Sequence, residues 1–363
     1  MKLTEKIATG KRPFLIAGPC SAESEEQVMT VCTDIAKLGN VQMLRAGIWK
    51  PRTRPNSFEG VGKIGLNWIV KAGHELEIPV IIEVANSAHV EMALKAGIKN
   101  LWIGARSTVN PFTVQEIADS LKGEKDLTVL IKNPINPDLG LWIGAFERFQ
   151  MAGINDLHAI HRGFSQHKKS VYRNEPMWEI PLALRTELPN IKMFCDPSHI
   201  AGRRDLLLGV SQKAMDLVYD GLMIETHVRP DEAWSDAAQQ ITPEKLNELL
   251  NLLVIRKVDA EEGLIVENLD GLRADINEID SEILTLMAKR MKVIDKIGSF
   301  KKENNITILQ PKRWEEINRI QLEHAAQLGL DANYVKHYLE LIHQESIRRQ
   351  TIVMNKYSHK TES

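Results

Sequence analysis

The first two-thirds of the chain alternates short apolar runs with amphipathic helical stretches, and this alternation restricts the possible folds more than any other feature. About eight runs of strand length occur, the first at residues 14–17 and the last at residues 222–225. Strands that alternate with helices form parallel sheets. About eight such units in roughly 250 residues predict an α/β fold, a closed (β/α)8 TIM barrel. An open, doubly wound sheet is the alternative.

The character of the sequence changes after about residue 257. Apolar residues recur at alternating spacings of three and four between Leu269 and Phe300, which predicts a long amphipathic helix with a coiled-coil-like seam. Residues 310–328 and 333–355 predict two shorter helices, and this part shows no strand pattern. We therefore predict a barrel at residues 1–257, a linker at 258–265 and an all-α helical domain at 266–363.

The charge and cysteine content narrow the class of protein. A net charge of −2 at pH 7 provides no overall attraction to nucleic acid or to an anionic membrane. No apolar run reaches the ~20 residues that span a bilayer, and the N-terminus lacks the apolar segment of a signal peptide. Three cysteines, an odd and sparse count, favour a reducing compartment. We expect a cytoplasmic protein with no nucleic-acid and no membrane partner.

Charged residues follow several of the apolar runs, at the strand ends from which α/β barrels take their catalytic residues. A single Lys or Arg there is ordinarily a solvated surface residue, but six cations at one mouth would repel one another strongly. A polyanionic ligand would relieve this repulsion, and phosphate is the natural candidate. The six cations are Arg45, Lys50, Arg52, Arg106, Lys132 and Arg162.

Other strand ends carry side chains that can ligate a metal ion. Taken singly, Cys20 is more often a buried small side chain, and His199 is more often a capping residue. Together with two carboxylates they form a mixed sulfur, nitrogen and oxygen set that suits one divalent transition metal, and Mn, Fe, Co and Zn all accept such ligands. The candidate metal ligands are Cys20, His199, Glu225 and Asp236.

Five short motifs follow one another in the barrel segment: AGPCS at 17–21, KPRT at 50–53, GAR at 104–106, DPSH at 196–199, and the Glu225/His227 pair. Over about residues 12–257 the chain resembles the 3-deoxy-D-arabino-heptulosonate 7-phosphate (DAHP) synthase family, in its compact type related to 3-deoxy-D-manno-octulosonate 8-phosphate (KDO8P) synthase. The resemblance implies a metal-dependent condensation of phosphoenolpyruvate with erythrose 4-phosphate in the shikimate pathway. KDO8P synthase uses arabinose 5-phosphate instead, and KPRT in place of its KANRS-like motif argues against that alternative.

The same resemblance implies roles for individual residues. Cys20, His199, Glu225 and Asp236 are the implied metal ligands. Lys50 is also expected to protonate the new hydroxyl group. Arg52 and Thr53 would bind the aldose phosphate. The implied phosphoenolpyruvate site consists of Arg45, Lys50, Arg106, Lys132 and Arg162, and Glu83 is placed in the same substrate-binding set.

In the second part, Arg290 interrupts the apolar seam of the long predicted helix. A charge in an apolar seam is costly unless it binds a partner, so Arg290 is a candidate ligand-binding residue. The alternative is that Arg290 sets the register of the helices or forms a buried ion pair. Residues 266–355 resemble the all-helical chorismate mutase family through LRADINEIDSEILTLMAKR, Lys301, QPKRW and ESIRRQ. The resemblance implies the rearrangement of chorismate to prephenate. The implied ligand-binding residues are Arg273, Arg290, Lys301, Arg313, Ser346 and Gln350.

The mutase resemblance has further implications. The arginines would hold the two carboxylates, while Lys301 and Gln350 would stabilise charge on the ether oxygen. A homodimer is implied, in which Arg273 reaches the partner chain's site. Gln310 and Trp314 stand where some family members have carboxylates, so a non-catalytic ligand sensor and dimerisation module is the alternative. Since prephenate lies downstream of the barrel's expected product, we expect prephenate to inhibit the barrel by feedback.

Overall fold

The computed structural model of the protein describes Leu3, Glu5 and Ile7 and residues 12–50, 58–166, 169–257 and 264–355. Contacts within the chain divide it into two units, Met1–Val258 and Asp259–Ser363, which we describe separately. The predicted linker at 258–265 lies largely outside the described residues. Among the helices of the described segments, none combines the length and the apolar character that a membrane-spanning helix requires.

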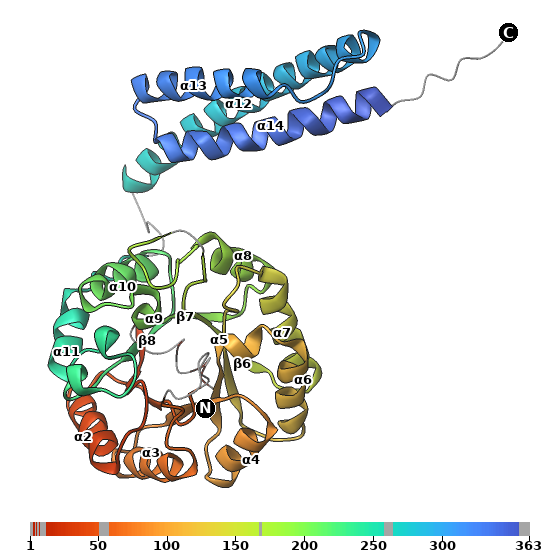
Figure 1. Ribbon diagram of the computed structural model, residues 1–363. Helices are drawn as coiled ribbons and strands as arrows, with labels where there is room; N and C mark the ends of the chain where they lie inside the picture. Colours follow the sequence, from red (N-terminus) through yellow and green to blue (C-terminus); the bar gives the residue numbers. More distant parts are fainter. Residues whose placement is uncertain are drawn as a thin grey trace. The chain divides into compact units, whose positions relative to one another are not determined.

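The first unit is a closed barrel of parallel strands that pair in sequence order (Figure 1). The barrel closes where β1 pairs with β8 from Phe14 opposite Gly221 to Gly18 opposite Glu225. The predicted (β/α)8 barrel is confirmed, and the open-sheet alternative is wrong. The strands are β1 (Phe14–Gly18), β2 (Met43–Ala46), β3 (Val80–Val84), β4 (Asn100–Ile103), β5 (Thr128–Lys132), β6 (Asp156–His161), β7 (Lys192–Cys195) and β8 (Gly221–Glu225).

Helices surround the barrel, and polar side chains cap many of their first turns. Ser24, Asn86 and Asp138 each accept a hydrogen bond from a backbone N–H in the first turn of the helix that follows. The helices are α2 (Glu25–Ala36), α3 (Lys63–Glu75), α4 (Ser87–Lys95), α5 (Ala105–Thr108), α6 (Pro111–Ser120), α7 (Leu139–Met151), α8 (Glu179–Glu187), α9 (Pro197–Ala201), α10 (Leu207–Asp216) and α11 (Pro243–Leu252).

The last barrel helix, α11, ends before the helical pattern of the sequence does. Thr242 caps it and Pro243 occupies its first turn. The helical pattern in the sequence runs to residue 257, but the helix ends at Leu252. The amide of Gln212 holds the chain beyond this point, donating to the Val254 carbonyl at 2.9 Å and accepting from the Val254 N–H at 2.9 Å. A tertiary contact therefore overrides the local helical preference.

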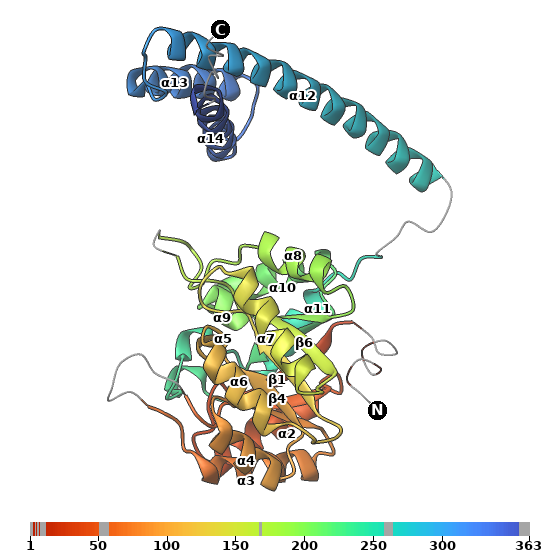
Figure 2. The same ribbon diagram turned by 90° about the vertical axis from the view of Figure 1, so that its right-hand side faces the viewer.

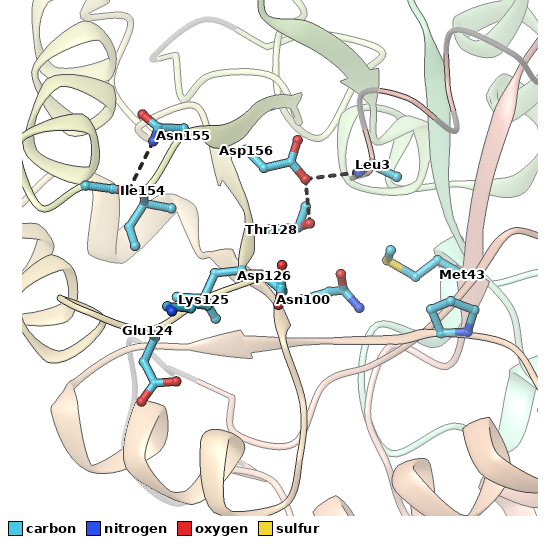
Figure 3. Close-up of a pocket in the computed structure, with 13 residues that line it drawn as sticks. Leu3, Met43, Asn100, Glu124, Lys125, Asp126, Thr128, Ile154, Asn155 and Asp156 are labelled. Carbon is cyan, nitrogen blue, oxygen red and sulfur yellow. Dashed lines mark hydrogen bonds between the residues drawn. The ribbon is translucent and has the colours of Figure 1, made fainter. Parts of the chain in front are cut away.

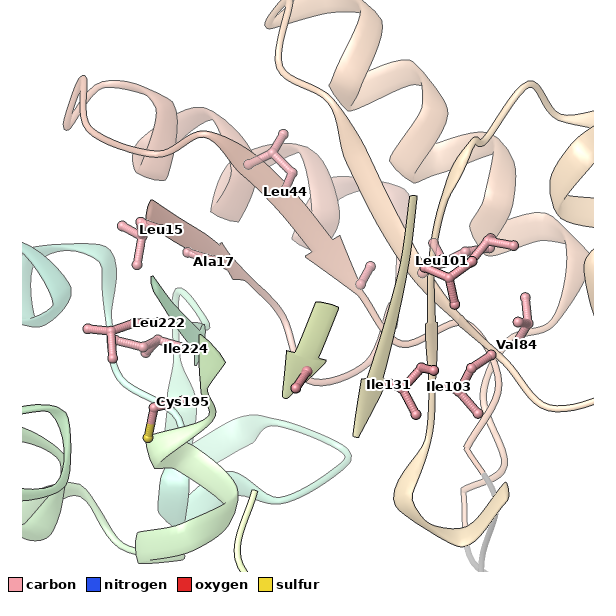
Figure 4. Packing of buried hydrophobic residues seen from close by; sticks show 14 of the residues in the cluster. Leu15, Ala17, Leu44, Val84, Leu101, Ile103, Ile131, Cys195, Leu222 and Ile224 are labelled. Atoms are coloured by element: carbon pink, nitrogen blue, oxygen red, sulfur yellow. The ribbon is translucent and has the colours of Figure 1, made fainter. Parts of the chain in front are cut away.

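Two apolar layers hold the strands in place. One lies between the sheet and the helices and includes Leu15, Ala17 and Leu101 (Figure 4). The other fills the barrel interior and includes Phe14, Trp102 and the N-terminal residue Leu3. Alternate strand residues enter the two layers because successive side chains point to opposite faces of a strand. The polar side chains at the strand ends are therefore held by a packed core on both sides.

The second unit consists of three helices, α12 (Leu264–Glu303), α13 (Pro311–Gln327) and α14 (Ala332–Asn355) (Figure 2). The all-helical prediction for this part is confirmed. Helices α12 and α14 approach closely at Gly298, where an added side chain would press on Gln350 and Val353. The apolar seam of α12 stays exposed along the single chain, at Leu272, Ile276, Ile279, Ile283, Leu286, Val293 and Phe300.

Candidate active sites

Two buried ion pairs lie at the carboxyl ends of the barrel strands. Arg45 Nη2, on β2, lies 3.1 Å from Glu225 Oε1 at the end of β8. Lys132 Nζ, at the end of β5, donates to Asp196 Oδ2 at 2.8 Å. All four side chains are at most 5% exposed. A buried charge is costly unless it is paired, so removing either member of a pair would leave its partner uncompensated.

The predicted metal ligands lie at three strand ends, where they form two close pairs. Cys20 Sγ lies 3.4 Å from Asp236 Oδ2, and His199 Nε2 lies 3.8 Å from Glu225 Oε1. Burial and the nearby carboxylate of Glu225 raise the pKa of the Cys20 thiol to about 12. Burial would raise the pKa of Glu225, but His199, Arg45 and Lys50 lower it to about 2. In the described part of the chain, no three His, Cys, Asp or Glu side chains are arranged as a metal-binding group.

Unsatisfied polar atoms indicate whether these residues fit a metal ion. Among the described residues, the buried Glu225 Oε1 accepts no hydrogen bond, and its ion-pair partner Arg45 Nη2 lies 3.1 Å away. His199 Nδ1 lies 2.8 Å from Asp196 Oδ2, and His199 Nε2 faces Glu225 at 3.8 Å. Buried polar atoms without partners are rare and call for an explanation. Thiol, imidazole and carboxylate donors with spare capacity fit a divalent transition metal.

Arg173 is a site residue that the sequence analysis missed. Its Nη1 donates to Asp236 Oδ1 at 2.9 Å and to Gln239 Oε1 at 2.6 Å. Asp236 adopts a left-handed backbone conformation with φ 48°, which is uncommon for a residue other than glycine. Gln239 in turn donates to Glu225 Oε2 at 2.6 Å. Arg173 thus connects two of the predicted metal ligands, and it follows no strand directly, so strand-end reasoning could not find it.

The remaining predicted barrel residues lie in three situations. Arg162 is buried, and burial together with the neighbouring cations Arg173 and Arg106 lowers its pKa to about 10. Arg106 is exposed at the start of α5. Glu83 accepts a hydrogen bond from Trp102 Nε1 at 2.9 Å and packs on Gly104, where any side chain would collide with its carboxylate. Arg52 and Thr53 lie outside the described residues.

A further pocket, of about 520 Å³, lies at the opposite end of the barrel (Figure 3). It is lined by Asn100, Thr128 and Asp156, the first residues of β4, β5 and β6. Asp156 Oδ2 accepts hydrogen bonds from Thr128 Oγ1 at 2.6 Å and from the backbone N–H of Leu3 at 3.0 Å. Active sites of (β/α)8 barrels lie at the carboxyl ends of the strands, so this pocket is separate from the predicted site.

The helical unit contains a pocket of about 930 Å³ between its three helices. Arg290 Nη1 donates to Ser346 Oγ at 2.8 Å, so this seam residue turns toward the pocket. Lys301 Nζ donates to the Ile308 carbonyl at 2.6 Å. Gln350 Oε1 is buried and has no hydrogen-bond partner among the described residues. The predicted residues that line the pocket are Arg290, Lys301, Arg313, Ser346 and Gln350, together with Gln310 and Trp314.

Two residues depart from the sequence-based expectation for this pocket. Arg273 does not line it; the side chain is exposed on α12 and forms an ion pair with Asp270 at 2.9 Å. His343 does line it, although no role was expected for it. Its ring stacks on Trp314 at 3.9 Å between centroids and 15° between planes. Partial burial and the nearby Arg290 lower the pKa of His343.

Known proteins share both units. Residues 1–262, most of the chain, match the DAHP synthetase I family. The chain belongs to the DAHP synthetase I family. Phospho-2-dehydro-3-deoxyheptonate aldolase of Thermotoga maritima is 31% identical over 237 residues, which cover 65% of this chain and 67% of that protein. The crystal structure of DAHP synthase from Thermotoga maritima aligns with a TM-score of 0.59 and 27% identity, over 66% of this chain and 67% of that one.

Other relatives bear on the alternative and on the second unit. 2-Dehydro-3-deoxyphosphooctonate aldolase of Desulfotalea psychrophila is 26% identical over 284 residues, 70% of this chain and 94% of that protein. Residues 272–351 match chorismate mutase type II. A bifunctional chorismate mutase/prephenate dehydratase of Buchnera aphidicola is 37% identical over 91 residues, 24% of this chain and 23% of that protein. The chain therefore joins a DAHP synthase domain to a chorismate mutase domain and is a bifunctional enzyme of aromatic biosynthesis.

Proposed function

We propose that the barrel condenses phosphoenolpyruvate with erythrose 4-phosphate to give DAHP and phosphate, at the carboxyl ends of its strands. The observation that carries the proposal is the convergence of buried cations there: Arg45, Lys132 and Arg162 are all at most 8% exposed. Among the described residues, Arg45 Nε and Nη1 have no hydrogen-bond partner, so they would be available to an anion. In the reaction, C3 of phosphoenolpyruvate bonds to the aldehyde carbon, water adds at C2, and phosphate leaves.

We assign the phosphoenolpyruvate cradle to the cations at this mouth. A carboxylate and a phosphate bound by several fixed cations hold the enol carbon in one orientation, which lowers the entropic part of the barrier. Lys50 lies beside Cys20 and is suited to donate a proton to the oxygen that becomes the new hydroxyl. Arg52 and Thr53 are proposed to bind the aldose phosphate. The cradle consists of Arg45, Lys50, Arg106, Lys132 and Arg162, with Glu83 beside it.

We also propose that the barrel requires one divalent transition metal. Cys20, His199, Glu225 and Asp236 would hold it, and the buried Glu225 Oε1, which accepts no hydrogen bond among the described residues, supports this assignment. A bound metal of this kind supplies Lewis acidity toward an aldehyde oxygen. Arg173 neutralises Asp236 through their 2.9 Å contact. The proposed role of Arg173 and Gln239 is to orient two of the ligands, as partners of metal ligands commonly do.

For the helical unit we propose chorismate as substrate and prephenate as product. The supporting observation is the pocket that gathers the cations Arg290 and Lys301 with the polar side chain of Gln350 around one cavity. Such a rearrangement needs positioning and electrostatic stabilisation but no covalent step. The proposed homodimer would add Arg273 of α12 to the partner's pocket, and the exposed seam of α12 supports helix pairing. Prephenate bound in this pocket is proposed to inhibit the barrel.

One set of assays tests these proposals. The purified chain is incubated with phosphoenolpyruvate and erythrose 4-phosphate, with arabinose 5-phosphate in a parallel reaction, and phosphate release is followed. Release with erythrose 4-phosphate and none with arabinose 5-phosphate is expected; the reverse would assign the barrel to KDO8P synthesis. Chorismate consumption is measured in the same preparation. A chain that binds chorismate without consuming it would make the helical unit a sensor.

A further inference from the structure

Trp102 of β4 is fully buried in the barrel interior, yet its indole contacts three residues of the proposed substrate site. Its Nε1 donates to Glu83 Oε2 at 2.9 Å. The guanidinium carbon of Arg45 lies over the ring at 4.9 Å from the centroid, and Lys132 Nζ lies over it at 5.8 Å. Both distances are within the ~6 Å at which a cation is attracted to an aromatic face. One side chain thus contacts residues from β2, β3 and β5.

The polar contacts of Arg45 show what the indole ring contributes to the position of its guanidinium. Arg45 pairs with Glu225, and its buried Nε and Nη1 have no hydrogen-bond partner in the part of the chain that the structure describes. A guanidinium that keeps these donors for a ligand cannot be held by hydrogen bonds at the same donors. An aromatic face attracts the cation without using any donor. The ring under Arg45 therefore stabilises it in a state ready to bind an anion.

The chemistry of the indole exceeds what packing alone requires. The interior of an α/β barrel is ordinarily filled by branched aliphatic side chains, and the neighbours of Trp102 include Ile81, Leu130 and Ile160. Tryptophan offers the strongest cation–π face of the aromatic side chains and also an N–H donor. Both features are used here, one by the two cations and the other by Glu83.

We propose that Trp102 is a positioning residue that sets the affinity of the cradle for the anionic enol-phosphate substrate. Its face holds Arg45 and Lys132, and its N–H orients Glu83. The inference rests on the proposed condensation. A substrate that carries both a carboxylate and a phosphate should sense the spacing of these two cations, whereas the aldose phosphate should not.

The test compares Trp102→Leu and Trp102→Phe with a matched variant, Phe14→Leu. Phe14 belongs to the same interior cluster, and its ring packs against Phe194. In the described part of the chain it makes no cation–π contact with Arg45 or Lys132. For each variant, kcat, the KM of each substrate and the melting temperature are measured, with phosphoenolpyruvate binding by calorimetry without the aldose. Trp102→Leu should raise the KM and Kd of phosphoenolpyruvate by about 10- to 30-fold, the value of a desolvated cation–π contact. Trp102→Phe should give a smaller rise, and the KM of erythrose 4-phosphate should stay within about twofold.

Phe14→Leu should lower the melting temperature and leave phosphoenolpyruvate affinity unchanged. Wild-type affinity in both Trp102 variants, or an equal loss in Phe14→Leu, would overturn the inference. Where Trp102→Leu does not fold, Trp102→Phe decides, because it keeps an aromatic ring in the core. A wild-type chain that forms no DAHP would instead refute the proposed function, so the two failures are distinguishable.

Discussion

Lys50 Nζ lies 2.9 Å from the sulfur of Cys20 and 3.0 Å from the Cys20 carbonyl oxygen. The contact joins the proposed proton donor to a proposed metal ligand. Burial alone would lower the pKa of Lys50, but electrostatic interactions with the acidic groups Cys20, Glu225 and Asp236 raise it above the ordinary value. The raised pKa favours the ammonium form of Lys50, which the proposed role as proton donor to the new hydroxyl requires.

Removal of metal should separate the two activities. A chelator should abolish DAHP formation, and a divalent transition metal added in excess should restore it, because the proposed condensation depends on the Lewis acidity of the metal that Cys20, His199, Glu225 and Asp236 would hold. Chorismate consumption in the same tube should not change, since no proposed mutase residue is a metal ligand. Cys20→Ala that keeps full condensation activity without added metal would refute the ligand assignment.

Arg106→Ala should damage the condensation alone. Arg106 is exposed at the start of α5, so its loss should not affect folding, but it would remove the proposed charge-assisted contact to substrate phosphate. We expect kcat/KM for DAHP formation to fall about 10- to 100-fold. Lys95→Ala, which removes an exposed helical lysine that pairs with Glu91, is the control and should keep normal activity. Equal rates in the two variants would exclude Arg106 from the site.

Arg290→Ala should remove most mutase activity. The substitution deletes a half-buried guanidinium that faces the pocket beside Ser346. Loss of such a contact costs on the order of 2–4 kcal/mol, a decrease of about 30- to 1000-fold in kcat/KM for chorismate. Arg348→Ala, which breaks an exposed pair with Glu345 on α14, should leave the rate unchanged. Normal turnover in Arg290→Ala would make Arg290 a residue of the helix seam only.

A charge placed in the seam of α12 should prevent dimerisation. Ile279 is 55% exposed in the single chain, and Ile279→Asp would place a carboxylate in the proposed helix pair. Analytical ultracentrifugation should show a smaller species, and mutase activity should fall because Arg273 no longer reaches a partner's pocket. Leu252→Asp changes a leucine that is 63% exposed on α11 and serves as the control. A dimer of unchanged size in Ile279→Asp would place the interface elsewhere.

Prephenate should inhibit DAHP formation in the full chain. A coupling of about 1–3 kcal/mol between the two units is sufficient and requires that prephenate bind one arrangement of the units better than another. Inhibition should be lost in Arg290→Ala and in a chain truncated near Lys257. DAHP formation measured against prephenate concentration tests this. Equal inhibition of the wild-type and truncated chains, or none in either, would contradict regulation through the helical unit.

Much of the architecture can be predicted from local sequence patterns. The apolar periodicity predicted the barrel and the three helices, because a period of two or of 3.6 residues records which face of an element is buried. It also predicted that charged side chains gather at strand ends. Arg290 was recognisable as a site candidate for the same reason, since a charge in an apolar seam conflicts with burial.

The pairing of those side chains was decided only by the tertiary structure. Arg45 could have paired with any carboxylate at the mouth, and barrel closure between β1 and β8 brings Glu225 to it. Trp102 looks like an ordinary strand residue in the sequence, and its contacts exist only because β2, β3 and β5 surround it. Arg273 remains exposed in one chain. Periodicity is a property of neighbouring residues, whereas distances across a barrel depend on the register of all its strands. The sequence alone therefore determined which groups face the site, and the fold determined which of them touch.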